Sequence, residues 1–289
     1  MPAFPIVDTH VHFRDPGRVS YSWVDEVPEL NRSFGLDDYR AACDTVDVAD
    51  LVFVEVGCDV QDCAEEVRWV TELAEDELRI RGIVAQAPLE QGAAVRGELE
   101  VLAENHLVKG IRRLLQTEEV DFCLQASFLE GLRLLPAFDF SFDICVYHGH
   151  LSNVVEMVRR CEDVRFVLDH AGKPDIRGQR FEPWKTHIQE LAGFPNVICK
   201  MSGLATQADH RNWTPGNLQP YIEHVIECFG FDRVMFGGDW FVSTLATTYP
   251  RWVHVLDSAL RGCSEAELGA LYCVNAKLVY RLTDATTWT

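Results

Sequence analysis

The feature that most constrains the fold is a regular recurrence of short, apolar, β-branched runs separated by stretches with helical spacing. Eight runs occur, at 6–12, 51–57, 81–87, 108–114, 142–148, 164–170, 196–202 and 233–239. Near-continuous apolar runs are typical of parallel strands buried on both faces. Between them lie amphipathic segments such as 64–73 and 218–229, whose apolar positions recur every three and four residues.

Eight predicted strands alternating with helices favour closure into a (β/α)₈ TIM barrel. Such a barrel needs about 250 residues, so we expect residues 1–289 to form one domain. An open doubly wound sheet is less favoured, because no G-x-G-x-x-G motif follows the first run. The irregular stretches 17–36, 177–184 and 206–220 are interpreted as loops.

Composition narrows the class of partner. The formal net charge of −19 disfavours binding to nucleic acid, because phosphate backbones are repelled by an acidic surface. No apolar run is long enough to span a bilayer, and the first residues lack the features of a secretory signal. The ten cysteines are scattered singly, which is typical of free thiols in a reducing compartment. A cytoplasmic protein with a small-molecule partner is expected, and the sequence indicates no oligomeric state.

Ionisable and polar residues gather at the carboxyl ends of the predicted strands. In chain order they are His10, His12, Glu55, Arg112, Arg113, His148, His170, Lys200, Ser202 and Asp239. In a (β/α)₈ barrel these ends meet at one mouth, where the active site lies. Buried charge is costly unless it is paired or functional, so the pattern predicts an active site there.

The first strand carries an H-x-H motif. Side chains two residues apart point to the same face of a strand, so His10 and His12 could bind one metal ion together. An isolated H-x-H motif is weak evidence, since two surface histidines would give the same pattern. Its place at the end of the first predicted strand favours a site at the barrel mouth.

Four segments resemble signatures of the amidohydrolase superfamily. They are 7–12 (VDTHVH), 169–174 (DHAGKP), 200–204 (KMSGL) and 235–240 (MFGGDW). The similarity is to the sugar-lactonase-like branch, which includes L-fucono-lactonases, L-rhamnono-lactonases and pyrone-dicarboxylate lactonases. It runs from about residue 6 to residue 282. This sequence departs from the branch at Gly238, where serine is expected, and at Phe241, where proline is expected.

The resemblance implies a (β/α)₈ fold and hydrolysis of a cyclic ester. It places His10 and His12 at the first-strand positions, His170 at the sixth-strand histidine and Asp239 at the aspartate that activates water. One divalent metal ion, Zn²⁺ first, is expected on His10, His12 and Asp239, with metal-independent catalysis left open.

The remaining site residues are assigned by position. With Asp239 and His170, the candidate catalytic residues are Arg112 and Lys200; the candidate substrate-binding residues are Trp23, Glu55, His148, Ser202 and Trp240. Each has a structural alternative: Glu55 could pair with an arginine, Lys200 could be ion-paired, and His148 could be a core histidine. Arg112 and Arg113 point to opposite faces of a strand, and Arg112 is preferred for the pocket. His106, His187, His224 and His254 are interpreted as solvated.

The expected reaction is hydrolysis of a sugar (aldono-)lactone of the L-fucono, L-galactono or L-rhamnono type. A serine nucleophile is disfavoured, because no G-x-S-x-G motif occurs. The rival interpretations are a metal-dependent decarboxylase of the same superfamily, a TatD-like nuclease, which the acidic charge disfavours, and a barrel that binds a sugar acid without turnover.

Overall fold

Eight parallel strands form the inner ring of the molecule in a computed structural model, which describes residues 4–282. Each strand is hydrogen-bonded to the next in chain order, so the sheet runs from β1 to β8 without a crossover. The strands are β1 (Ile6–Val11), β2 (Val48–Val54), β3 (Ile80–Ala85), β4 (Val108–Arg112), β5 (Ser141–Ile144), β6 (Arg165–Leu168), β7 (Val197–Met201) and β8 (Val234–Phe236). The chain is therefore a (β/α)₈ barrel, as the sequence predicts.

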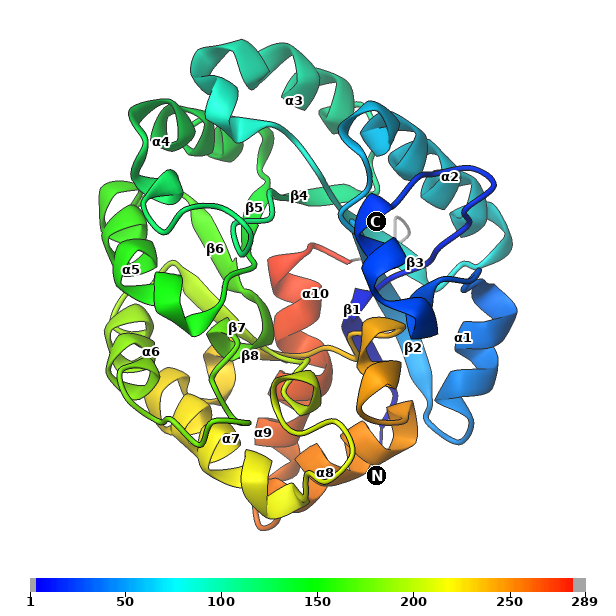
Figure 1. Ribbon diagram of the computed structural model, residues 1–289, viewed down its shortest axis with the longest axis vertical. Coiled ribbons are helices and arrows are strands. Elements are labelled where there is room, and N and C mark those ends of the chain that lie inside the picture. The colour runs from blue at the N-terminus through cyan, green and yellow to red at the C-terminus, as the bar shows by residue number, and fades with distance from the viewer. Residues whose placement is uncertain (1–3, 283–289) are drawn as a thin grey trace, which may run out of the picture.

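The ring closes where the first strand meets the segment after the last one (Figure 1). The backbone N–H of Asp239 donates to the carbonyl of His10 at 2.8 Å, and the N–H of His12 donates to the carbonyl of Trp240 at 2.6 Å. The side chain of Asp8 also spans this seam, because the N–H of Gly238 donates to its Oδ1 at 2.7 Å. His10, His12 and Asp239, which the sequence analysis assigned to the site, thus also take part in closing the barrel.

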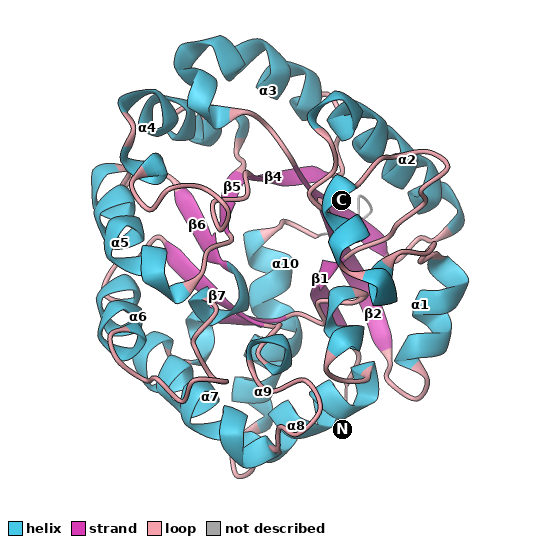
Figure 2. Ribbon diagram, viewed as in Figure 1, coloured by secondary structure: helices cyan, strands magenta, loops and turns pink. Residues whose placement is uncertain are grey.

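Helices surround the strands as an outer layer (Figure 2). They are α1 (Leu36–Cys43), α2 (Cys63–Asp76), α3 (Arg96–Ala103), α4 (Ala126–Leu132), α5 (Leu151–Arg160), α6 (Trp184–Ala192), α7 (Pro215–Phe229), α8 (Tyr249–Ala259) and α9 (Glu265–Gly269). Helix α5 illustrates why they pack: Leu151, Val154, Val155 and Val158 are buried, at helical spacing, while Arg160 is exposed at the end of the helix.

A tenth helix, α10 (Asn275–Val279), lies within the ring of strands in the view of Figure 1. With the residues that follow it, α10 packs against inward-facing side chains of the strands. This cluster consists of Val7, Val52, Val54, Val84, Val167, Met235, Ala276, Val279, Tyr280 and Leu282. The apolar contact holds the end of the described chain against the barrel interior and places Tyr280, which is fully buried, among the strands.

Several expected element boundaries are wrong, among them those of the fifth strand and of the loop at 206–220. The fifth predicted strand, 142–148, ends in the structure at Ile144, so His148 lies four residues beyond it, in a short 3₁₀ turn. The predicted loop at 206–220 overlaps helix α7, which begins at Pro215. Proline is tolerated at the first helical position, where its missing N–H would have no partner. The N–H of Thr214 donates to Asn217 Oδ1 at 2.7 Å and helps start the helix.

The ten cysteines are free thiols, and six of them are buried. Within residues 4–282, no helix combines the length and the apolar content needed to cross a membrane.

Candidate active site

Three imidazole rings converge on the carboxylate of Asp239. Its Oδ1 lies 3.6 Å from Nε2 of His12. The Nε2 atoms of His10 and His170 each lie 3.9 Å from the same oxygen. All four side chains are buried at the carboxyl ends of β1, β6 and β8 or just beyond them. The structure therefore brings together the three predicted histidines and the predicted aspartate.

The orientation of the His12 ring leaves a lone pair facing Asp239. Its Nδ1 lies 2.8 Å from the carbonyl oxygen of Val54. Because a carbonyl oxygen only accepts hydrogen bonds, Nδ1 carries the hydrogen of the neutral ring and Nε2 carries the lone pair. A buried lone pair beside a buried carboxylate is unfavourable unless a proton or a cation lies between them.

The other two rings are also held through Nδ1. Nδ1 of His170 lies 2.8 Å from Oγ of Ser202. Nδ1 of His10 lies 3.3 Å from Oδ1 of Asp169. Metal-binding histidines usually use their second nitrogen in this way, with a carboxylate, carbonyl or hydroxyl as partner. The Nε2 atoms of His12 and His170 are therefore free to act as ligands near Asp239, whereas Nε2 of His10 also lies 3.3 Å from the donor Nη1 of Arg112.

Backbone strain marks two of these residues. His170 and Asp239 both adopt a left-handed conformation, with φ of 53° at each. Non-glycine residues rarely occupy this region, and those that do are concentrated at functional sites. At His170 the backbone leaves β6 in a tight turn, Asp169–Gly172, and the imidazole lies with its centre 4.5 Å from that of His10.

Burial keeps His10 and His170 neutral. It lowers the pKa of His10 well below its ordinary value and lowers that of His170 to about 4. Burial disfavours ionisation of Asp239, but the neighbouring His170 and the contact with His12 outweigh it and hold the pKa of Asp239 below its ordinary value. At neutral pH the imidazoles of His10 and His170 are therefore uncharged beside an ionised carboxylate.

This donor set fits one divalent metal ion. One ligand atom from each of His10, His170 and Asp239 lies within 4.8 Å of the other two, so His170 takes the place in this group that the sequence analysis gave to His12. Tetrahedral zinc with bonds of about 2.0–2.1 Å needs donor atoms about 3.4 Å apart, so a small contraction around an ion suffices. A second group, Cys145, Asp169 and His170, meets the same distance limit. It is a poorer cation site, because Asp169 already faces the positive charges of an arginine and a lysine.

Arg112 is buried next to His10 and is paired with two carboxylates. Its Nε donates to Glu55 Oε1 at 2.5 Å, and its Nη1 lies 3.2 Å from Asp169 Oδ2 and 3.3 Å from Nε2 of His10. Glu55 is thus paired with an arginine, the structural alternative noted from the sequence. Arg113 points away from the barrel interior and binds Glu90 and Glu118.

Lys200 lies inside the barrel, below His10. Its side chain is fully buried, with Nζ 2.6 Å from Asp143 Oδ2, 3.2 Å from Asp169 Oδ1 and 3.4 Å from Nδ1 of His10. Every one of these partners is itself buried. An ammonium group held in this way acts on substrate only through the residues around it.

The remaining predicted residues lie around this centre. His148 is half-buried, with Nδ1 3.2 Å from the carbonyl of Lys173. Trp23 is half-buried and donates to the carbonyl of Val56 at 2.8 Å, at the end of β2. Trp240 is only 2% exposed and packs edge-on among neighbouring aromatic rings. These three do not touch Asp239 in any described contact.

Sequence reasoning missed three residues of the buried network: Asp143, Asp169 and Tyr280. The first two had a signal, because each is an acidic residue within or directly after an apolar strand. Tyr280 had none, since its hydroxyl donates to Asp143 Oδ2 at 2.7 Å from 137 residues away.

The departure at Gly238 has a steric cause. A Cβ atom there would lie 2.5 Å from Asp8 Oδ2, closer than real Cβ contacts, so serine would force the seam apart. At the second departure, the ring of Phe241 stacks on Phe34 with centroids 4.3 Å apart.

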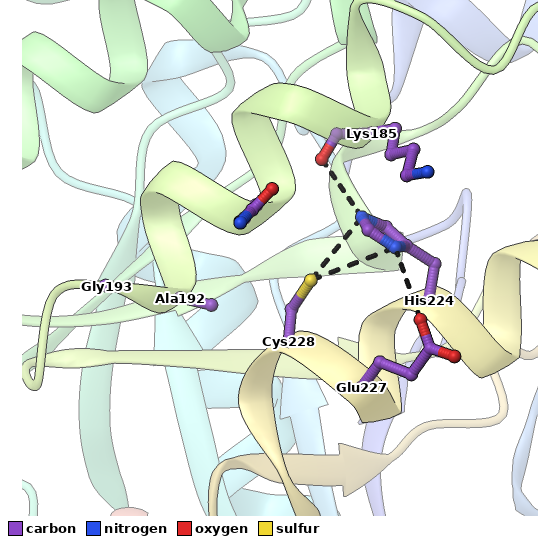
Figure 3. A pocket seen from close by; sticks show the side chains of 7 residues that line it. Lys185, Ala192, Gly193, His224, Glu227 and Cys228 are labelled. Atoms are coloured by element: carbon purple, nitrogen blue, oxygen red, sulfur yellow. Dashed lines mark hydrogen bonds and ion pairs between the residues drawn. The ribbon is translucent and has the colours of Figure 1, made fainter.

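A groove outside the barrel holds another histidine (Figure 3). It lies between α6 and α7 and is lined by Lys185, Gln189, Ala192, Gly193, His224, Glu227 and Cys228. His224 is buried, so the expectation that it is solvated is wrong. Its Nε2 donates to the carbonyl of Lys185 at 3.0 Å. Among the described residues, groups of three potential metal ligands were found only at the strand ends, not in this groove.

Comparisons with known proteins agree with the architecture and with the motifs. The chain is 30% identical to an L-fucono-1,5-lactonase of Burkholderia multivorans, with 96% of each chain covered. It is 21% identical to an L-rhamnono-gamma-lactonase of Scheffersomyces stipitis, with 98% of this chain and 100% of the relative covered. A crystal structure of an amidohydrolase from Burkholderia multivorans with bound zinc superimposes with a TM-score of 0.86 at 29% identity, covering 97% of this chain and 100% of that one. The amidohydrolase family model matches residues 7–282, and the chain belongs to that family.

Proposed function

We propose that this protein is a hydrolase that opens the cyclic ester of a sugar lactone, with water activated by Asp239. The observation that carries the proposal is the convergence of three imidazole Nε2 atoms on one ionised carboxylate oxygen at the barrel mouth. Curated relatives over nearly the whole chain are named as lactonases for L-fucono-1,5-lactone and L-rhamnono-gamma-lactone. Ester hydrolysis at such a site needs no cofactor that carries electrons or groups.

Asp239 is placed to act as the general base. Its carboxylate is ionised at neutral pH and is only slightly exposed, so it accepts a proton from water without competition from bulk solvent. The water oxygen adds to the lactone carbonyl carbon, and its proton passes to Asp239. The carbonyl oxygen becomes an oxyanion that needs a positive or hydrogen-bond-donating neighbour.

Collapse of the tetrahedral intermediate breaks the bond between the carbonyl carbon and the ring oxygen. The departing alkoxide takes the proton that Asp239 received, so the carboxylate is regenerated. The product is an open-chain hydroxy acid, which ionises and releases one proton to solvent. One ring opened therefore yields one proton.

The residues that would hold a metal ion are His10, His12, His170 and Asp239. When bound, a divalent ion supplies Lewis acidity toward the carbonyl oxygen and toward water. Ser202, Val54 and Asp169 keep the three rings oriented through Nδ1. Arg112 adds fixed positive charge next to His10, and its pairing with Glu55 prevents it from moving into the site.

The substrate proposed first is a six-carbon aldonolactone of the L-fucono, L-galactono or L-rhamnono type. Such a molecule is neutral, which suits a chain with a net charge of −19. Trp23 and His148 lie half-buried on the connections that follow β1 and β5 and offer an aromatic surface and a polar ring to sugar hydroxyl groups.

A panel of sugar lactones assayed with a pH indicator tests the proposal, because each turnover releases a proton. We expect turnover of at least one L-configured aldonolactone and none after mutation of Asp239. Carbon dioxide release from an aromatic acid, without lactone turnover, would instead assign a decarboxylase. Binding of a sugar acid with neither reaction would assign a non-catalytic barrel.

A further inference from the structure

A cluster of fully buried polar side chains lies next to the active site. Asp143, Asp169, Lys200, Tyr280 and His10 are each fully buried. They form a continuous chain of contacts from helix α10 to the first histidine of the H-x-H motif. The proposed reaction uses none of the first four directly.

The chain begins at the end of α10. The Tyr280 hydroxyl donates to Asp143 Oδ2 at 2.7 Å, and Nζ of Lys200 donates to the same oxygen at 2.6 Å. The Lys200 ammonium also lies 5.3 Å from the centre of the Tyr280 ring. Tyr280 therefore contacts the lysine both through a shared carboxylate and through the face of its ring.

The chain continues to His10 through Asp169. Oδ1 of Asp169 lies 3.2 Å from Nζ of Lys200 and 3.3 Å from Nδ1 of His10, which are ion-pair distances without hydrogen-bond geometry. Two carboxylates, one on each side, thus compete for a single lysine. The Tyr280 hydroxyl satisfies part of the hydrogen-bonding capacity of Asp143 and so leaves Lys200 free to reach Asp169.

We propose that Tyr280 is a positioning residue for the active site, acting through Asp143, Lys200 and Asp169 to fix the orientation of the His10 imidazole. Without the hydroxyl, Asp143 draws the ammonium toward itself, and Asp169 loses one of its two cationic partners and keeps only Arg112, which contacts its other oxygen. The Nε2 atom of His10 then loses its fixed aim at Asp239. The proposal rests on the proposed function for its kinetic consequence but not for its structural one.

Tyr280→Phe removes one oxygen atom and keeps the packing. Loss of a partner that orients a metal ligand typically costs about 10- to 100-fold, and Tyr280 is more remote, so we expect the lower figure of about 10-fold. That loss should appear in kcat and in zinc affinity measured by competition with a chelator, with KM nearly unchanged.

Tyr272→Phe is the matched control. Tyr272 is also fully buried near the end of the described chain, but among residues 4–282 its hydroxyl has no hydrogen-bond partner. Its loss should leave both kcat and zinc affinity unchanged. If Tyr280→Phe behaves like Tyr272→Phe, the positioning role is wrong.

A second variant tests the same path if Tyr280→Phe folds poorly. Asp143→Asn breaks the chain one step closer to Lys200 and should lower the same two quantities. In the double mutant, the losses should not add, because both changes interrupt one path; full additivity would overturn the proposal.

An NMR measurement separates this proposal from the proposed function. The imidazole N–H signal of His10, assigned with His10→Gln, should shift in Tyr280→Phe and not in Tyr272→Phe. If the wild-type protein opens no lactone, the proposed function fails, while zinc affinity and this signal still decide the role of Tyr280. An unshifted signal with unchanged zinc affinity would refute it.

Discussion

Two buried histidines of this protein have very different surroundings. His170 at the barrel mouth is anchored through Nδ1 and directs Nε2 toward a carboxylate that two further imidazoles also face. In the outer groove, Nε2 of His224 donates a hydrogen bond to a backbone carbonyl. Cys228 Sγ lies 3.4 Å from the same nitrogen, and a carboxylate oxygen of Glu227 lies 3.9 Å from Nδ1 (Figure 3). Both rings are buried and have polar neighbours.

The difference is convergence. At the mouth, residues from three strand ends direct three imidazole Nε2 atoms toward one carboxylate oxygen, and their Nδ1 atoms face other groups of the protein. In the groove, the histidine, cysteine and glutamate come from one helix, and a main-chain bond already satisfies the ring. A buried histidine indicates a functional site only when its free nitrogen and those of its neighbours meet.

The largest expected effect comes from Asp239→Asn. The amide keeps the volume but cannot accept a proton from water, and loss of a general base typically costs about 10² to 10⁴ in rate. We expect kcat for the preferred lactone to fall by at least the lower figure, with much less change in substrate affinity. Steady-state kinetics on a variant with a native circular dichroism spectrum measures it. Near-normal turnover would remove Asp239 from the mechanism.

Replacing His10 and His12 together with alanine tests the metal. Two of the converging nitrogen atoms disappear, so bound zinc should fall to the background level in elemental analysis, and activity should fall with it. The same double change cannot affect His224. Activity that survives both this change and removal of metal by a chelator would mean that the histidines serve the substrate directly.

Ser202→Ala tests whether the hydrogen bond at Nδ1 of His170 holds this ring in place. The Ser202 hydroxyl is the only described hydrogen-bond partner of the His170 ring, at 2.8 Å. Loss of such a partner typically costs about 10- to 100-fold in metal affinity or activity. Chelator competition and kcat should both change, while Ser202→Thr, which keeps a hydroxyl, should recover part of the loss. Equal behaviour of the alanine and threonine variants would argue against anchoring.

Acid should destabilise the metal-free protein through the mouth histidines. The pKa of His170 is lowered from 6.5 to about 4 by burial, so the folded state binds fewer protons than the unfolded state between these values. This contribution is present above pH 6.5 and is lost as the pH falls through 4. It amounts to up to about 3 kcal/mol. Denaturant unfolding of wild type and His170→Gln at pH 7 and pH 4.5 should show a flatter dependence in the variant; parallel curves would contradict it.

The smallest effect is expected for His224→Gln. One hydrogen bond to a main-chain carbonyl is lost or rebuilt, which costs about 1 kcal/mol of stability. Lactone turnover and zinc content should remain at wild-type levels. A fall in either would show that the groove communicates with the mouth.

The strands and the converging residues could be predicted from the sequence because both obey local rules. Apolar runs identify the strands, and barrel geometry brings His10, His170 and Asp239 to one mouth. His148 was misplaced because Cys145, Val146 and Tyr147 continue the apolar pattern after the hydrogen-bonded ladder has ended. A pattern of hydrophobicity does not record where backbone pairing stops.

Tyr280 and Lys200 show a second limit of sequence analysis, which is that it does not identify the partners of a buried polar group. The lysine was recognised, but its position under His10 depends on three carboxylate and tyrosine partners from separate elements. The alternation of side chains along a strand indicates which residues point inward. Which partner a buried charge selects inside the barrel depends on the packing of distant segments.

The seam between β1 and β8 has a consequence for the making of the protein. Asp8 and Gly238, which meet there, are 230 residues apart in the chain. At roughly 5–20 residues per second, a ribosome needs roughly 10–50 s between them. A nascent chain therefore presents His10 and His12 long before Asp239 exists. An ion that needs Asp239 as a ligand can be held firmly only after Asp239 has been made, so metal loading should report that synthesis has passed β8.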